Sequence, residues 1–217
     1  MNVRVEIVIF RLQDSTLQAL LTKRPSHTFK GRMVLPGRRA REGESLERTA
    51  LRELKKQLSV TRVYLEQLYS FGDPHRGPRH VVSVAYYALT PGRREFRSGS
   101  RASDAAWWGI GQLPPLAFDH RRILDYALER LRNKLKYTAA GFELLPRKFT
   151  LPELQAMYES ILGKKLDKRN FRKKMDLLGI LEPLREWRRT GRKPARLYIF
   201  VPKKFEKLED KRILCPF

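Results

Sequence analysis

The sequence predicts an α+β protein of two domains: a mixed-sheet domain over residues 1–140, and a smaller domain over residues 141–217 that combines helices with a β-hairpin. Three observations support this prediction. The N-terminal part contains short apolar segments with the period-two spacing of strands, and helices follow them without regular strand–helix alternation. After residue 140 the pattern changes to helix, turn, helix and hairpin. A chain of 217 residues is long enough for one full domain and one compact domain.

Strands dominate the N-terminal half of the chain. Residues 3–10 have period-two spacing, and a turn at Asp14 and Ser15 would connect them to an antiparallel partner at residues 17–22. A short apolar segment lies at residues 33–35, and further strands are expected at residues 64–71, 81–89 and 105–108.

Two helices complete the first domain. Ser45 can cap the first, whose apolar positions recur at helical spacing from Leu46 to Leu58. Asp119 can cap the second, which extends to about Lys136. The apolar stripe of the second helix consists of Ile123, Leu124, Ala127, Leu128, Leu131 and Leu135.

The second domain has local signals at nearly every boundary. Thr150 and Glu153 form a capping box that opens a helix. Asp167 can cap a second helix, and Gly179 can end it. Two strands then flank a basic loop at residues 188–194. This order of elements is that of a winged helix-turn-helix, in which the hairpin is the wing.

The charge of the chain points to a polyanionic partner. Lys and Arg number 46 against 23 Asp and Glu, which gives a formal net charge of +23. Residues 147–217 carry 20 basic and 9 acidic side chains, about twice the net charge density of the rest. We therefore expect double-stranded DNA to bind the second domain, although a merely solvated basic surface is the alternative.

Several protein classes are set aside. No run approaches the ~18 apolar residues of a membrane span. Arg4 and Glu6 interrupt the N-terminal apolar segment, which a signal peptide would not tolerate. The single cysteine, Cys215, cannot form an internal disulfide. A cytoplasmic protein without membrane contact is expected.

The second helix of the C-terminal domain is the expected DNA-reading element. Phe171, Met175 and Leu178 would form its core face. Arg can bind guanine and Asn adenine, whereas Lys and the wing favour phosphates. The alternatives are a solvated face, a contact with another protein, or RNA binding. RNA binding fits less well, because exposed aromatic side chains would be expected for base stacking, whereas Phe171 and Phe200 fall on core faces. The candidate DNA-binding residues are Lys168, Arg169, Asn170, Arg172, Lys173, Arg188, Arg189, Arg192 and Lys193.

Residues 35–60 resemble the Nudix box, a loop–helix–loop motif of pyrophosphate hydrolases that binds Mg²⁺ through glutamates. The matching residues are Pro36, Gly37, Gly43, Glu44, Arg52, Glu53, Leu54 and Val60. Four positions depart from the pattern: Arg38 and Ser59 replace glycines, and Lys56 and Gln57 replace the adjacent glutamates.

These departures predict that the motif has lost its metal. Mg²⁺ prefers oxygen ligands, whereas Lys56 supplies an ammonium group that repels it and Gln57 a neutral amide. We therefore expect no bound metal, no cofactor, no catalytic residues and no enzymatic activity. Arg52 and Glu53 are expected to form a buried structural pair, and Glu44 to accept backbone amides.

A domain that has lost its catalytic activity can still bind an anion. Arg38, Arg39 and Arg41 cluster in the loop before the helix, and two more arginines lie in the loop at residues 72–80. Guanidinium groups suit a diphosphate, although each could also simply face solvent. The candidate effector-binding residues are Arg38, Arg39, Glu53, Asp73, Arg76 and Arg79.

The two domains together resemble the NrtR-like regulators of NAD metabolism, which combine a degenerate Nudix domain with a winged helix-turn-helix. Besides the Nudix-like box, the resemblance lies in residues 71–74, 81–89, 107–108, 113–120, 142–146, 149–155 and 166–174. It implies a Nudix-like α/β/α domain followed by the DNA-binding domain. It also implies a homodimeric transcriptional repressor of a palindromic operator. The implied effector is ADP-ribose, a related metabolite or a sugar.

Two other functions remain open. One is a Nudix-type nucleoside diphosphate hydrolase with a basic nucleic-acid-binding appendage, against which Lys56 and Gln57 speak. The other is an RNA-binding accessory protein. For the regulator, the helix from Asp119 to Lys136 is the expected coupling element, because it joins the two domains.

Overall fold

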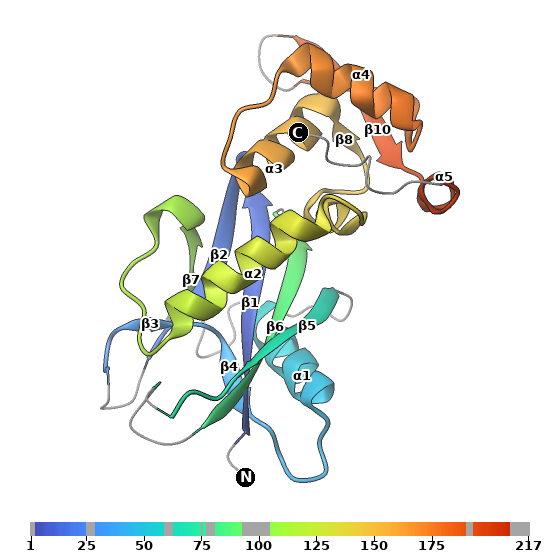
Figure 1. The fold of residues 1–217 in the computed structure, drawn as a ribbon. Coiled ribbons are helices and arrows are strands. Elements are labelled where there is room, and N and C mark those ends of the chain that lie inside the picture. The colour runs from blue at the N-terminus through green and yellow to red at the C-terminus, as the bar shows by residue number, and fades with distance from the viewer. Residues whose placement is uncertain are drawn as a thin grey trace.

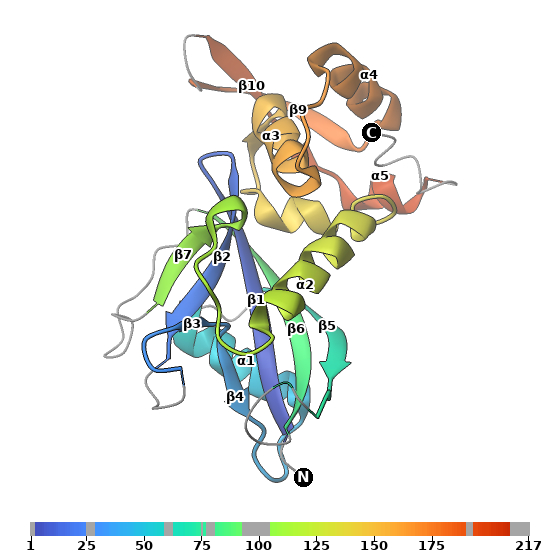
Figure 2. The same cartoon turned by 60° about the vertical axis from the view of Figure 1, so that its left-hand side comes forward.

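The computed structural model describes residues 3–24, 29–58, 63–74, 76, 81–92, 105–189 and 193–208. The first domain is a twisted sheet with α2 across one face and α1 against the other, and the second domain lies beyond the far end of α2 (Figures 1 and 2). The elements of the first domain are β1 (Val3–Gln13), β2 (Thr16–Lys23), β3 (Met33–Val34), β4 (Gly37–Arg39), α1 (Leu46–Leu58), β5 (Tyr64–Phe71), β6 (Val82–Pro91), β7 (Ala105–Gly109), the 3₁₀ turn Ile110–Gln112, and α2 (His120–Lys134).

The sheet is mixed, as the sequence predicted. β1 lies at its centre and pairs in parallel with β6, from Val3 opposite Val82 to Leu12 opposite Pro91. β2 and β4 pair with β1 in antiparallel fashion, and the outer strands β3, β5 and β7 pair antiparallel with β2 or β6. The turn between β1 and β2 falls at Asp14 and Ser15, both with positive φ, where the hairpin was expected.

β4 corrects the sequence prediction. Arg38 and Arg39 were expected in a loop before the first helix, but they belong to a short strand beside β1, with Val5 opposite Arg38. The polar composition of this strand gave no period-two signal, because two of its three residues are arginines. The strand fixes both backbones, so that Arg38 lies at a defined position next to α1.

Both faces of β1 are buried. Val8 and Phe10 face the cluster that contains the apolar stripe of α2, whereas Ile7 and Ile9 pack with Leu54 and the rest of the apolar face of α1. The predicted stripe of α2 is buried throughout. Each large apolar side chain of these clusters contributes roughly 1.5–3 kcal/mol on burial, so the two clusters hold the sheet and its two helices together.

The N-terminus of α2 differs from the prediction. Asp119 occupies the N-cap position but makes no side-chain capping hydrogen bond. Its carboxylate instead accepts two hydrogen bonds from Arg76, at 2.9 and 2.8 Å. The prediction rested on sequence position alone and could not include an arginine from a distant loop.

The second domain confirms the predicted winged helix-turn-helix. Thr150 and Glu153 form the expected capping box, Asp167 caps the backbone amide of Asn170, and Gly179 ends the helix in the left-handed region. The elements are the 3₁₀ turn Ala140–Leu144, β8 (Phe149–Thr150), α3 (Leu151–Leu162), α4 (Lys168–Leu178), β9 (Leu181–Arg189), β10 (Pro194–Phe200) and α5 (Pro202–Glu206).

One continuous hydrophobic cluster joins the two domains. It includes Leu131 of α2, Met157 and Ile161 of α3, and Phe171 of α4. Two hydrogen bonds add to this contact: Ser160 Oγ accepts the amide of Leu17 at 2.7 Å, and Arg132 Nε donates to the carbonyl of Ile161 at 2.7 Å. A rotation of α3 against the first domain would therefore have to repack α2 and the β1–β2 hairpin.

Among the described helices, none combines the length and the apolar character needed to cross a membrane.

Candidate effector site and nucleic-acid interface

The loop that precedes α1 is held by an arginine–glutamate pair. Arg52 Nε and Nη2 donate to the two oxygens of Glu44 at 2.7 and 2.6 Å, and Thr49 Oγ1 donates to Glu44 at 3.0 Å. The hydrogen bonds from Arg52 lower the pKa of Glu44 to about 2. The expectation that Arg52 would pair with Glu53 is wrong, because the loop brings Glu44 back within reach of the arginine.

Glu53 lies at the centre of the candidate effector site. It is only 3% exposed, and Gln57 Nε2 donates to its Oε1 at 2.7 Å. Its other oxygen, Oε2, is buried without a hydrogen bond. Two cations lie beside the carboxylate: Lys56 Nζ is 3.8 Å from Oε1, and Arg38 Nε is 3.7 Å from Oε2.

These residues do not fit the Mg²⁺ of a hydrolysing Nudix site. Of the three glutamates that would converge on the ion, only Glu53 remains, and Lys56 and Arg38 place positive charge next to it. Nowhere in the described ranges do three His, Cys, Asp or Glu side chains come close enough to hold a metal ion. The site is suited to an anion rather than to a divalent cation.

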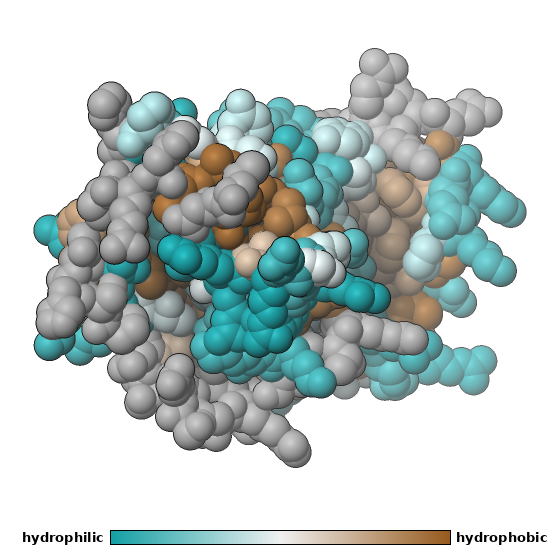
Figure 3. Space-filling view, turned by 90° about the horizontal axis from the view of Figure 1, so that it is seen from below, coloured by the Kyte–Doolittle hydropathy of each residue, from teal (hydrophilic) through white to brown (hydrophobic). Residues whose placement is uncertain are grey.

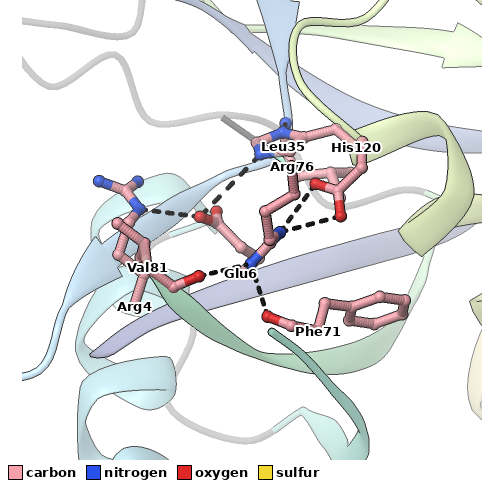
Figure 4. A network of polar contacts seen from close by, with 8 residues as sticks. Arg4, Glu6, Leu35, Phe71, Arg76, Val81 and His120 are labelled. Carbon is pink, nitrogen blue, oxygen red and sulfur yellow. Dashed lines mark hydrogen bonds and ion pairs between the residues drawn. The ribbon is translucent and has the colours of Figure 1, made fainter. Parts of the chain in front are cut away.

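A second buried carboxylate lies on β1, next to β4 (Figure 4). Glu6 is 2% exposed, accepts a hydrogen bond from Arg4 Nε at 2.8 Å, and lies 4.0 Å from His120 Nε2. Gly37 makes room for it, because a Cβ there would lie 1.8 Å from Glu6 Oε2. This network was not predicted from the sequence, although the two charged residues Arg4 and Glu6 inside an apolar strand were a signal for it.

The surroundings of His120 favour its neutral form. Its Nδ1 accepts the amide of Leu35 at 2.9 Å, so the proton of the neutral ring lies on Nε2, toward Glu6. Burial lowers the pKa of His120 below its usual value of 6.5. Glu6 and Asp119 oppose this shift, and Arg4 and Arg76 reinforce it.

This geometry predicts a pH-dependent stability. The unfolded chain takes up a proton on His120 below pH ~6.5, whereas the lowered pKa means that the native state takes it up only at lower pH, so acid favours unfolding. Wild type should lose up to about 1.4 kcal/mol per pH unit more than His120→Asn, which retains an acceptor for Leu35. Urea unfolding at pH 7.5, 6.5 and 5.5 measures this. Parallel curves for the two proteins would contradict it.

The remaining predicted effector residues are Arg39, Asp73, Arg76 and Arg79. Arg76 is bound to Asp119 and donates to the carbonyls of Phe71 and Val81, at 2.8 and 3.4 Å (Figure 4). This leaves it little capacity for an effector. Arg39 and Asp73 are exposed, and Arg79 lies outside the described residues.

The end of the first domain that carries the N-terminus is not uniformly polar. Figure 3 views this end and shows hydrophobic residues gathered near the centre, with hydrophilic residues around them. This end of the molecule therefore combines apolar and polar surface.

The outward face of α4 carries the predicted DNA-binding residues of this helix. Phe171, Met175 and Leu178 are buried in the core. The exposed residues of this helix include all five DNA-binding candidates: Lys168, Arg169, Asn170, Arg172 and Lys173. The first two turns of the helix thus present basic and amide-bearing side chains to solvent, and the exposed Asp176 and Leu177 follow them.

The wing is only partly as expected. Arg189 and Lys193 are exposed, and Arg192 lies outside the described residues. Arg188 instead donates to both oxygens of Glu153, at 2.9 and 3.1 Å, and to the carbonyl of Lys148. Glu153 is also part of the capping box of α3, so its contact with Arg188 holds the wing against the start of this helix.

An exposed aromatic residue lies next to α4. Trp187 of β9 is 62% exposed, beside Arg196 in the register of the wing. A groove of about 360 Å³ between α3, α4 and the wing is lined by Trp187, Arg172 and Asp176, among others. Trp187 was not among the predicted site residues, although an exposed aromatic side chain among basic residues is suited to stack on nucleic-acid bases.

Comparison with known proteins matches both domains. Residues 2–127 match the NUDIX domain, and residues 141–200 match the NrtR DNA-binding winged helix domain. The ADPR responsive transcriptional repressor NtrR of Acinetobacter baylyi is 36% identical over 202 residues, which cover 91% of this chain and 81% of that protein.

Solved structures and a second relative extend the comparison. Shewanella oneidensis NrtR complexed with a 27mer DNA has a TM-score of 0.80 at 35% identity, covering 94% of this chain and 95% of that chain. The NUDIX domain of the same protein, complexed with ADP ribose, has a TM-score of 0.53 at 36% identity, covering 60% and 88%. An ADP-ribose pyrophosphatase of Methanocaldococcus jannaschii is 36% identical over 109 residues, 49% of this chain and 64% of that enzyme.

Proposed function

The chain belongs to the NrtR family of Nudix-domain transcriptional regulators, and from this premise we propose that it is a repressor that binds operator DNA through its winged helix and responds to ADP-ribose. The observation that carries the proposal is the arrangement of α4. Five basic or amide side chains are exposed on one side of this helix, and its apolar side chains on the other side are buried in the core. A relative with the same architecture is complexed with DNA.

The effector site of this proposal is the surface around Glu53. Arg38 approaches its carboxylate from β4, and Lys56 approaches it from α1. Arg39, exposed on the same strand as Arg38, is a further candidate contact. The ADP-ribose bound by the NUDIX domain of a relative supports a diphosphate-containing effector.

Repression and release require two arrangements of the molecule. We propose a cytoplasmic homodimer in which ADP-ribose favours the arrangement whose two α4 helices no longer match the half-sites of a palindromic operator. Only a difference in effector affinity between the two arrangements can produce this shift. The packed contact of α2 and the β1–β2 hairpin with α3 supports a mechanical coupling of the effector site in the first domain to the DNA-binding domain.

The first domain is proposed to bind its effector without hydrolysing it. With Mg²⁺ or Mn²⁺, the purified protein should not convert ADP-ribose to AMP and ribose 5-phosphate above background, because Lys56 and Gln57 replace two metal-binding carboxylates. Chromatography of the products measures this. Turnover on the order of 1 s⁻¹ would favour the hydrolase with a basic appendage instead.

The direct test of the proposed function is a binding titration. Fluorescence anisotropy with duplexes from the regions upstream of the protein's own and neighbouring genes should identify a specific site, against a scrambled duplex as control. ADP-ribose should release the protein from that site, whereas ribose 5-phosphate, which lacks the diphosphate, should not. Equal binding of all duplexes would contradict the proposal, as would release by neither compound.

A further inference from the structure

We infer that Arg38 and Lys56 take the place of the divalent cation of a Nudix site, so that the chain binds the diphosphate of its effector without metal. The inference rests on the proposed function and specifies the chemistry of that same site. Its starting point is the surviving glutamate: Glu53 is 3% exposed, and one of its oxygens is buried without a hydrogen bond. A buried carboxylate of this kind requires positive charge nearby.

The chain supplies that charge from two elements. Lys56 follows Glu53 by one turn of α1 and places Nζ 3.8 Å from Oε1, whereas Arg38 on β4 places Nε 3.7 Å from Oε2. The two cations thus bracket the carboxylate. Together they carry the same +2 charge as one Mg²⁺ ion, and β4 and α1 fix their positions.

Both cationic side chains remain accessible to a ligand from solvent. The Lys56 side chain is 42% exposed and that of Arg38 is 37% exposed, although Glu53 between them is buried. Both distances to the carboxylate exceed hydrogen-bonding length, so the contacts are electrostatic and leave the N–H groups available. A guanidinium fork and an ammonium group are the side chains that bind phosphate oxygens best.

Gln57 supports the same arrangement. It occupies the position of another metal-binding glutamate, and its Nε2 donates to Glu53 Oε1 at 2.7 Å. A neutral amide compensates part of the buried charge of Glu53 without adding a second carboxylate that would repel a diphosphate. A divalent cation placed here would lie close to two positive side chains, so metal binding and this arrangement exclude one another.

The alternative is that Arg38 and Lys56 only stabilise the fold. Ion pairs with partners exposed to this degree contribute little to stability, because water screens them. When one cation is lost, the other still lies beside Glu53, so loss of either should leave the melting temperature close to that of a control. Lys55 provides that control, because it is exposed on the same helix and Lys55→Gln changes the charge equally.

Isothermal titration of the full-length protein with ADP-ribose, once in EDTA and once in MgCl₂, tests the inference. Wild type should bind with the same affinity in both buffers. Lys56→Gln and Arg38→Gln should each weaken binding by roughly 10-fold or more, and Lys55→Gln should not. A separate titration with MnCl₂ alone should give no binding heat from this site, and heat that Glu53→Gln abolishes would overturn the inference.

The outcomes separate this inference from the proposed function. Binding that requires Mg²⁺ would overturn the inference and leave the effector assignment intact. So would equal binding by wild type and both variants. No binding by wild type in either buffer would overturn both the inference and ADP-ribose as the effector.

Discussion

Replacing Arg76 with Met is expected to lower the free energy of unfolding by about 3–5 kcal/mol, the range for breaking a buried ion pair by removing one partner. The Arg76 side chain is 8% exposed and that of Asp119 is 16% exposed. Two hydrogen bonds join them, at 2.9 and 2.8 Å, and a third reaches the carbonyl of Phe71 at 2.8 Å. Without the guanidinium group, the carboxylate and this carbonyl lose their partner at the start of α2.

Urea unfolding provides the measurement. Arg121→Met is the matched control, because Arg121 pairs with Asp125 on the surface of α2, where both side chains are more than half exposed. The control should change stability by no more than about 1 kcal/mol. Replacing both Arg76 and Asp119 by apolar residues should recover part of the loss, because no unpaired charge remains.

The same variant decides the role of Arg76. If Arg76→Met is as stable as the control but no longer binds ADP-ribose, the arginine is an effector ligand, as its position in the sequence suggested. The structure predicts the reverse: a large loss of stability, with binding lost only to the extent that the protein unfolds.

Replacing Arg169 with Ala is expected to weaken operator binding by about 1–3 kcal/mol, the range for a good side-chain pair with a base. Arg169 is exposed in the first turn of α4, where a helix in the major groove presents side chains to base edges. Random DNA should bind almost as before, because the phosphate contacts remain.

Arg189→Ala is the comparison for this prediction. Arg189 is exposed at the end of β9, on the wing, where we expect a phosphate contact. Its loss should weaken operator and scrambled duplex alike and reduce the salt slope by about one unit. Salt titrations of both variants on both duplexes measure the difference. If Arg169→Ala weakens the two duplexes equally, α4 does not read bases through this residue.

Most elements were predictable from the sequence because their signals are local. A capping box at Thr150, a cap at Asp167 and a left-handed glycine at Gly179 each involve residues within a few positions of one another. The stripe of α2 recurs at helical spacing. The two residues of β8 and the three of β4 are too short for any periodicity, and sheet neighbours far along the chain define them.

The partners of long charged side chains were less predictable. Arg52 has Glu44 and Glu53 as possible partners, and only the path of the loop decides for Glu44. Arg188 was expected to face DNA, but the folding of the hairpin over α3 brings it to Glu153. The buried network of Glu6 and His120 joins residues more than a hundred positions apart. In each case the backbone had to be placed before the charge could be assigned.

Reciprocal linkage between DNA and effector tests the central claim most directly. The operator affinity is measured with and without saturating ADP-ribose, and the ADP-ribose affinity is measured for free protein and for the operator complex. If one equilibrium between two arrangements couples the sites, ADP-ribose weakens operator binding, and the operator weakens ADP-ribose binding by the same factor. Two ratios equal to one would contradict the account, because the effector would then bind without acting on the DNA-binding domain.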